Sequence, residues 1–145
     1  MSRSGYVITL AGCPIIWASK MQSLIALSTT EAEYIALSTA LRKVISLMKL
    51  LKELKRRGLP ITLPVPTIRC QVFEDNLAAL ELANQPKLRP RTKHLAVRLH
   101  HFRDHVQRKD IQIQHVASKQ QVADIFTKPL PKEQFTYLRQ KLMGW

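Results

Sequence analysis

The chain has 145 residues, of which 46% are hydrophobic, enough for one globular domain with a real core and too few for two. It carries 23 Lys and Arg against 10 Asp and Glu, a formal net charge of +13 that favours a phosphate backbone as partner. Mere solubility or a ribosomal-type structural role is the simpler explanation of this charge. The sequence has no apolar run near the roughly 20 residues of a membrane span and no signal peptide, so we expect an intracellular chain, in cytoplasm or nucleus, without a membrane partner.

Residues 4–22 predict a hairpin of two strands. β-branched and aromatic residues alternate there on both sides of a Gly-Cys-Pro break. The two cysteines, Cys13 and Cys70, are not in CxxC pairs, so neither a zinc site nor a disulfide framework is indicated. We expect both to be small buried hydrophobes.

Residues 30–57 predict a long amphipathic helix. Its apolar stripe, at spacings of three and four residues, consists of Leu37, Ala40, Leu41, Val44, Leu47, Met48 and Leu51. Glu33 heads this stripe, whereas Glu31 lies on the opposite face with Arg42, Lys49 and Glu53. A carboxylate at the end of a core-facing stripe is costly unless a cation, a metal or hydrogen bonds receive it.

Glu33 also has a simpler interpretation. Thr30 and Glu33 fit the capping box S/T-x-x-E, in which Glu33 would only satisfy backbone N–H groups of the first helical turn. Considered on this segment alone, the capping box is favoured.

The rest of the chain predicts a second group of strands and helices. A strand at 67–75 ends on Asp75, just before a short helix in "NLAALELAN", so Asp75 is also a candidate N-cap. A strand at 111–116 follows a basic helix at 92–108, and helices at 118–143, interrupted at Pro129 and Pro131, complete the chain. This order of elements suits an α+β or α/β layer on a mixed sheet.

The helix predicted at 92–108 has an apolar stripe and a basic side. The candidate nucleic-acid-binding residues are this basic side and the loop before it: Arg89, Arg91, Lys93, His94, Arg98, His101 and His105. A solvated face is the simpler alternative. His101 and His105 have the spacing of a zinc pair, but "HFRDH" lacks the glutamate of H-E-x-x-H and no third ligand suggests itself, so zinc is not expected.

Four segments of the chain carry a resemblance to a known family: "SGYVITLAGCPIIWASKMQSLIALSTTEAEYIAL", "EDNLAAL", "RTKHLAVRLHHFRD" and "VADIFTKPLP". In order and spacing they resemble the signature blocks of the ribonuclease H domain of copia-type retrotransposon Pol polyproteins. The resemblance covers nearly the whole chain and implies a single domain over residues 1–145. The fold that it implies is α/β (α+β), a ribonuclease H-like mixed sheet flanked by helices.

This resemblance implies cleavage of the RNA strand of RNA–DNA hybrids with two magnesium ions, for which manganese is a possible substitute. The acidic positions of the family match Glu33, Asp75 and Asp124, which are therefore the candidate catalytic and metal-binding residues. Asp124 rests on the resemblance alone, because the helical count turns it away from the apolar Val122, Ile125 and Phe126.

One family feature has no counterpart in this sequence. The family's first catalytic aspartate lies on an opening strand, whereas the first acidic residue here is Glu31. The resemblance thus implies an N-terminally truncated sheet and an incomplete magnesium site, and we expect little or no activity from the chain by itself. Such a chain is either a fragment of a longer polyprotein or a remnant that no longer cuts. The strand would then come from the upstream reverse transcriptase part of the polyprotein or from another chain.

Two other functions stay open. The first is a catalytically inactive module of ribonuclease H-like fold that binds nucleic acid through its basic face. The second is an integrase-type or transposase core, which shares the fold and the acidic chemistry. The order of "EAEY" before "EDN", with the carboxylate on the helix, argues against this core.

Overall fold

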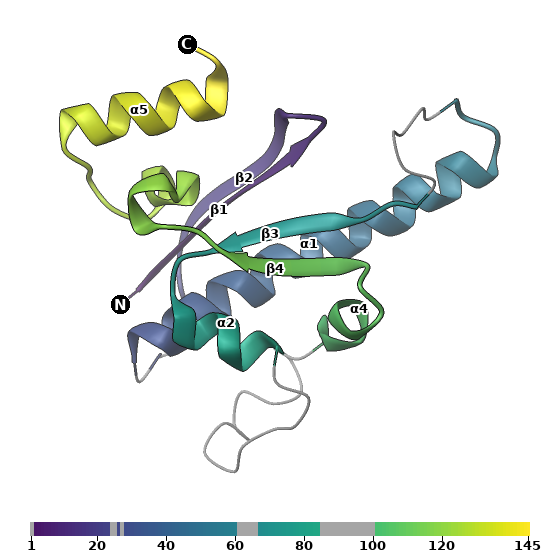
Figure 1. The fold of residues 1–145 in the computed structure, drawn as a ribbon, viewed down its shortest axis with the longest axis horizontal. Coiled ribbons are helices and arrows are strands. Elements are labelled where there is room, and N and C mark those ends of the chain that lie inside the picture. Colours follow the sequence, from purple (N-terminus) through teal and green to yellow (C-terminus); the bar gives the residue numbers. More distant parts are fainter. Residues whose placement is uncertain (1, 24–25, 27, 61–66, 85–100) are drawn as a thin grey trace.

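The computed structural model describes residues 2–23, 26, 28–60, 67–84 and 101–145. Within these residues the strands form two sheets of two strands each. Strand β1 (Arg3–Leu10) pairs antiparallel with β2 (Cys13–Met21), and β3 (Cys70–Glu74) pairs parallel with β4 (Ile111–His115). The long helix α1 (Thr29–Arg56) passes behind β3 (Figure 1). The mixed α/β class is confirmed, but the described strands do not join into the single mixed sheet that the sequence predicts.

The hairpin predicted at 4–22 is present as β1 and β2. Its turn is Ala11-Gly12, and both residues have positive φ angles, 50° and 81°, as a two-residue hairpin turn of right-handed twist requires. Cys13 is exposed, so its predicted burial is wrong. The reason is the period of two along β2, which places Cys13 on the outer face with Ile15 and Trp17.

Helix α1 begins one residue earlier than predicted and is capped differently. The Ser28 hydroxyl accepts a hydrogen bond from the backbone N–H of Glu31 at 3.1 Å, so Ser28 is the N-cap. The predicted capping box of Thr30 and Glu33 is therefore wrong, because the helix starts two residues before that box requires. Ser28 and Glu31 have the same S-x-x-E spacing, and Glu33 is not needed for capping.

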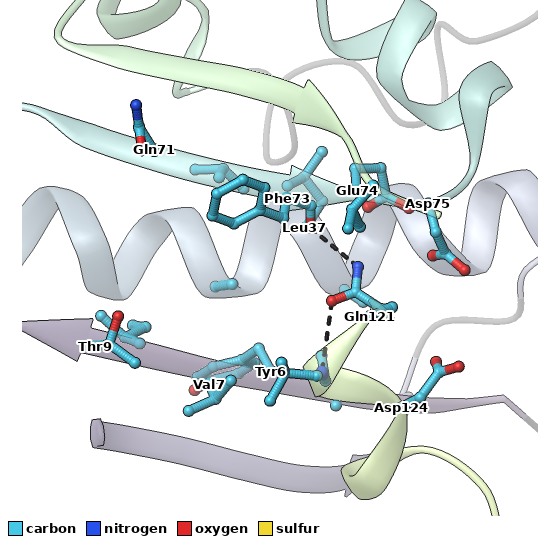
Figure 2. A pocket seen from close by; sticks show the side chains of 18 of the residues that line it. Tyr6, Val7, Thr9, Leu37, Gln71, Phe73, Glu74, Asp75, Gln121 and Asp124 are labelled. Carbon is cyan, nitrogen blue, oxygen red and sulfur yellow. Dashed lines mark hydrogen bonds between the residues drawn. The ribbon is translucent and has the colours of Figure 1, made fainter. Parts of the chain in front are cut away.

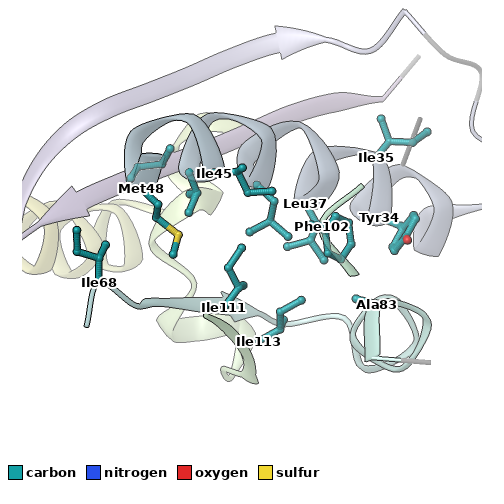
Figure 3. Packing of buried hydrophobic residues seen from close by; sticks show 13 residues of the cluster. Tyr34, Ile35, Leu37, Ile45, Met48, Ile68, Ala83, Phe102, Ile111 and Ile113 are labelled. Carbon is teal, nitrogen blue, oxygen red and sulfur yellow. The ribbon is translucent and has the colours of Figure 1, made fainter. Parts of the chain in front are cut away.

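The core lies between α1 and the β3–β4 sheet and extends to β1 (Figure 3). Tyr34 and Phe102 are fully buried, with ring centroids 5.9 Å apart. Ile111 and Ile113 of β4 pack against the same helix. The buried residues of α1 form a broader band than the predicted stripe: Tyr34, Ile35, Ala36, Leu37, Ser38, Leu41, Val44, Ile45 and Met48.

The remaining elements differ from the predictions mainly in length. Strand β3 starts at Cys70, although the strand was predicted from 67, and the short helix after it is α2 (Leu77–Asn84). Of the helix predicted at 92–108, residues 92–100 lie outside the described residues, and α4 covers only Arg103–Gln107. The C-terminal region holds two 3₁₀ helices, η2 (Ser118–Gln120) and η3 (Val122–Phe126), and then α5 (Lys132–Met143). No described helix has the length and apolarity needed to cross a bilayer.

Candidate carboxylate site

A cavity of about 510 Å³ lies between β1 and β3, with α1 behind it (Figure 2). Residues 5–9 of β1 and 70–74 of β3 line its two sides, and apolar residues of α1 line its base: Ala36, Leu37, Ala40, Leu41 and Val44. Four carboxylates also line it, namely Glu33, Glu74, Asp75 and Asp124. Figure 2 shows Glu74, Asp75 and Asp124 at the same end of the cavity, where β3 ends and η3 begins.

Glu33 lines the cavity from the first turns of α1. Its place in the apolar stripe predicts that Glu33 faces the core. The residue is exposed, so this prediction is wrong, and Glu33 lies at the opening of the cavity. The protein around it still removes enough water to raise the pKa of the Glu33 carboxyl, and the negative charges of Asp75 and Asp124 raise this pKa further. The nearby Lys128 ammonium acts in the opposite direction. The two aspartates therefore lie close enough to Glu33 to repel its charge.

Asp75 follows the last residue of β3 and is free of the capping role considered for it. Asn76 Oδ1 instead accepts hydrogen bonds from the backbone N–H groups of Ala78 at 3.0 Å and Ala79 at 3.1 Å. Asn76 thus caps the first turn of α2, so the N-cap interpretation of Asp75 is wrong. The Asp75 carboxylate, half-buried, lines the cavity.

Asp124 is the buried residue of η3, 7% exposed. The helical count that turned it away from the apolar side chains assumed an α-helix, whereas this segment is a 3₁₀ helix with three residues per turn. The Asp124 carboxylate lines the cavity, and its Oδ2 lies 2.7 Å from Lys128 Nζ.

Gly5 of β1 allows η3 to approach the cavity. A Cβ atom at Gly5 would lie 2.6 Å from Thr127 Cγ2 and 2.9 Å from both the carbonyl carbon and the Cβ of Phe126. Such distances are shorter than real Cβ contacts, so any side chain here would push the end of η3 away from β1. This close packing holds the segment that carries Asp124.

Glu74, the last residue of β3, also lines the cavity and is not among the predicted site residues. Glu74 is 6% exposed. Burial raises the pKa of its carboxyl to about 7, and the negative charges of Glu33 and Asp75 contribute to this increase. The backbone N–H of Asn76 donates to Glu74 Oε1 at 3.0 Å, which fixes the turn out of the strand. Alternation along the strand places Glu74 on the same face as Cys70 and Val72, so a signal for its burial was present in the sequence.

Gln121, immediately before η3, was missed as well. Its Nε2 donates to the Phe73 carbonyl of β3 at 3.0 Å, and its Oε1 accepts from the Ala123 N–H at 3.4 Å (Figure 2). The side chain therefore links the edge of β3 to the start of η3. An uncharged residue in a loop gave no signal for this role in the sequence.

Most of the predicted nucleic-acid-binding residues, namely Arg89, Arg91, Lys93, His94 and Arg98, lie outside the described residues. His101 is exposed and precedes α4, so it does not share a helical face with His105. His105 Nδ1 lies 3.6 Å from Asp110 Oδ2, and Lys52 Nζ lies 3.9 Å from the same oxygen. Lys52 is nineteen residues along α1 from Glu33, about 28 Å at 1.5 Å per residue. His105 is therefore not brought to the carboxylates.

The chemistry of the four carboxylates fits a hard divalent cation such as Mg²⁺, which prefers oxygen ligands. The mutual repulsion that raises the Glu33 pKa is what a bound cation would relieve. Their spacing is less favourable: in the described part of the chain, no three His, Cys, Asp or Glu side chains are grouped so that they could hold one ion. The donor chemistry fits the metal, and the present side-chain positions do not form a complete site.

The fold and the site define an α+β protein with a carboxylate-lined cavity, and comparisons with known proteins place it among homologues. The chain is 35% identical over 142 residues to the retrovirus-related Pol polyprotein from transposon RE1 of Arabidopsis thaliana, covering 98% of this chain and 9% of that protein. It is 36% identical over 143 residues to the Pol polyprotein from transposon TNT 1-94 of Nicotiana tabacum, covering 99% of this chain and 10% of that protein.

A more distant relative is the transposon Ty1-DR1 Gag-Pol polyprotein of Saccharomyces cerevisiae, 32% identical with 97% of this chain and 8% of that protein covered. The chain thus spans about a tenth of the length of the curated relatives it matches. No family model and no solved structure matches it. Its homologues are retrotransposon Pol polyproteins of the copia/Ty1 type, and the chain corresponds to one segment of them.

Proposed function

We propose that the chain is the ribonuclease H segment of a retrotransposon Pol polyprotein, which cleaves the RNA strand of RNA–DNA hybrids. The observation that carries this proposal is the convergence of Glu33, Asp75 and Asp124, from three distant parts of the sequence, at one cavity. Desolvation raises the pKa of the Glu33 carboxyl, and the charges of Asp75 and Asp124 raise it further. Homology to Pol polyproteins of retrotransposons supports the coarser statement that the chain is a retroelement-related segment.

In this proposal Glu33, Asp75 and Asp124 hold magnesium, or manganese in its place. The bound ions would supply activation of the attacking water and stabilisation of the leaving oxygen. Glu74 acts differently, because its carboxylate accepts the Asn76 N–H and keeps the turn that carries Asp75 in place. The net charge of +13 supplies attraction to the hybrid's phosphates, and the basic loop and helix from Arg89 to Arg98 would contact them.

The cavity also suggests how the site is completed, by one extended strand inserted between β1 and β3. The Gln22 N–H donates to the Ser2 carbonyl at 2.9 Å, so every second residue from Ser2 turns its backbone groups toward β2. The backbone groups of Arg3, Gly5 and Val7 therefore point to the other side of β1, where the cavity lies.

The facing edge of β3 follows from the same kind of alternation. The backbone N–H of Cys70 donates to the backbone carbonyl of Asp110 at 2.9 Å, and the carbonyl of Glu74 accepts from the backbone N–H of Val116 at 3.1 Å. The backbone groups of Cys70 and Glu74 therefore face β4. The backbone groups of Gln71 and Phe73 then face away from β4, and Gln121 bonds the Phe73 carbonyl from that side. The edges of β1 and β3 thus both present backbone groups to the cavity, with which an inserted β-strand could form hydrogen bonds. The side chains on one face of that strand could then pack on the apolar base formed by α1.

Hybrid cleavage by designed variants tests both parts of the proposal. An eight-residue strand of alternating valine and threonine, with one aspartate near its end, is joined to Ser2 through an Asn-Gly turn. We expect this fusion to cut a labelled RNA–DNA hybrid in Mg²⁺ or Mn²⁺, and the unextended chain to cut little or not at all. We also expect the fused strand to raise the melting temperature of the chain. A matched fusion with two prolines in the strand lacks two N–H donors and should lose both the cutting and this gain in melting temperature.

Cleavage by the unextended chain that is lost on Glu33→Ala would refute the need for the added strand and leave the nuclease function standing. Stabilisation by the fused strand without any cleavage would support the strand site and refute the nuclease function. Glu33→Ala in the fusion must abolish cutting, since a residual product at the same rate would place the chemistry elsewhere.

A nucleic-acid-binding module without catalysis is the second candidate. The observation that favours it is that no described group of three acidic, histidine or cysteine side chains is close enough to hold an ion. Such a module would bind hybrid with an affinity that falls steeply with salt, and neither Mg²⁺ nor the added strand would produce cleavage.

A further inference from the structure

The contact between Lys128 and Asp124 is unusual in its position. Lys128 Nζ lies 2.7 Å from Asp124 Oδ2, and the Asp124 residue is more than nine-tenths buried. The Asp124 Oδ2 atom is itself buried. The Lys128 side chain itself is 54% exposed, so a largely exposed lysine meets a carboxylate that has little water of its own.

Local structure directs Lys128 to this contact. The Asp124 carbonyl accepts hydrogen bonds from the Thr127 N–H at 3.1 Å, the Thr127 hydroxyl at 3.1 Å and the Lys128 N–H at 3.2 Å. These bonds close the turn after η3 and bring residue 128 back over residue 124. Packing of the same turn against Gly5 leaves it little room to move.

The charge of Lys128 reaches the whole cluster. Hydrogen bonding and charge attraction to Asp124 raise the pKa of the Lys128 ammonium, and the charges of Asp75 and Glu33 raise it further. In return, the ammonium lowers the pKa of the Glu33 carboxyl. Lys128 therefore compensates part of the negative charge where a divalent cation would have to bind.

We propose that the Lys128 ammonium is a built-in counter-ion of this carboxylate cluster, and that a divalent cation reaches Asp124 only when the ammonium withdraws into solvent. Two cations cannot share one carboxylate oxygen without strong repulsion. The Lys128 side chain is already more than half exposed, so the ammonium has solvent into which it can withdraw. The inference rests on the proposed function in that it concerns the same carboxylates.

The test measures Mn²⁺ binding by electron paramagnetic resonance and by titration calorimetry, without nucleic acid. Lys128→Met removes the ammonium and keeps the length of the side chain, and Lys128→Arg keeps the charge. Lys132→Met is the matched control, because Lys132 is an exposed lysine at the start of α5. We expect Lys128→Met to bind Mn²⁺ on the order of tenfold more tightly, and the other two to bind like the unsubstituted chain.

Thermal melting separates this role from a purely structural one. In EDTA the Lys128→Met variant should melt at a lower temperature, since the cluster has lost its counter-ion, and Mn²⁺ should restore it. Adding Asp124→Asn to Lys128→Met should remove both the gain in affinity and the restoration. Equal or weaker Mn²⁺ binding by Lys128→Met, or no binding by any variant, would overturn the inference.

Failure of the proposed function gives a different pattern of results. Tighter Mn²⁺ binding by Lys128→Met with no hybrid cleavage by any fusion would support the counter-ion and refute the nuclease. Hybrid cleavage by the fusion, with an unchanged Mn²⁺ affinity of Lys128→Met, would support the nuclease and refute the counter-ion.

Discussion

Glu33 and Glu53 are the same residue type on the same helix, twenty positions and about 30 Å apart, and they lie in opposite environments. Near Glu53 the charges are matched: Arg56 Nη2 and Arg57 Nε lie 2.9 Å and 2.8 Å from its Oε1. Hydrogen bonds from these arginines lower the pKa of Glu53, whereas partial desolvation and two neighbouring aspartates raise the pKa of Glu33.

The difference supports the proposal that a ligand binds at the Glu33 end of α1 and not at the Glu53 end. Exposed pairs such as those of Glu53 contribute little to stability and are screened by salt. Glu33, Glu74, Asp75 and Asp124 together form an excess of negative charge in a protein whose net charge is +13. An arrangement that costs stability and is maintained by close packing is typical of a functional site.

Neutralising each glutamate in turn tests the contrast between Glu33 and Glu53 most directly. In the strand-extended protein, Glu33→Gln should lower the rate of hybrid cleavage on the order of 10³-fold, since it removes a group that would stabilise the transition state. Glu53→Gln should leave the rate within about twofold, because it lies outside the cavity. Equal losses from the two substitutions would mean that the effect is global and that Glu33 has no special role.

The pH dependence of stability should have one sign for Glu74, which lines the cavity, and the opposite sign for Glu53, which lies outside it. The folded protein holds the Glu74 proton up to about pH 7, whereas the unfolded chain releases it near 4.5, so the stabilising effect is complete below 4.5 and is lost as pH rises through 7. Urea unfolding in EDTA should show a decrease of about 3 kcal/mol across this range that is absent in Glu74→Gln.

For Glu53 the lowered pKa means that the stabilising effect is present above the unfolded value of 4.5 and is lost as pH falls below it. The Glu53→Gln variant should therefore still show the decrease in the free energy of unfolding between pH 4.5 and about 7 that is attributed to Glu74. If Glu74→Gln and the unsubstituted chain had the same pH profile, the protonation of Glu74 would not be coupled to folding.

Gly5→Ala tests whether packing against β1 holds η3 in position. The added methyl meets Phe126 and Thr127 at less than 3.0 Å, so we expect a loss of about 1–3 kcal/mol in the free energy of unfolding. Gly58→Asn, just beyond the other end of α1, is the control. Gly58 has a φ of 85° and open space around it, which asparagine tolerates at a cost of a few tenths of a kcal/mol. Comparable losses in both variants would contradict the close contact at Gly5.

The smallest expected effect concerns the cap of α1. Ser28→Ala should cost about 1 kcal/mol by removing the acceptor of the Glu31 N–H, and Thr30→Ala should cost less than about 0.5 kcal/mol. Chemical denaturation of the two variants measures both values. The reverse order would restore the Thr30 box and give Glu33 a capping role.

Much of the local structure follows from sequence patterns. The hairpin, α1 and α2 lie where alternation, helical spacing and the residues at their ends predict them. The predictions were wrong where two signals lay a few residues apart, as with Ser28 and Thr30, or Asn76 and Asp75. Both members of each pair are good caps, and only the actual start of the helix decides between them.

Composition and short-range periodicity were enough to predict the α+β class and the positive charge, whereas the three candidate carboxylates came from the resemblance of the sequence motifs to a known family. Neither source predicted that Glu74 lies with these carboxylates, that Asp124 is buried beside Lys128 or that β1 and β3 face one cavity. Those properties arise from contacts between segments far apart in the chain. Burial and charge interaction depend on distance in space, which no local pattern of residues encodes.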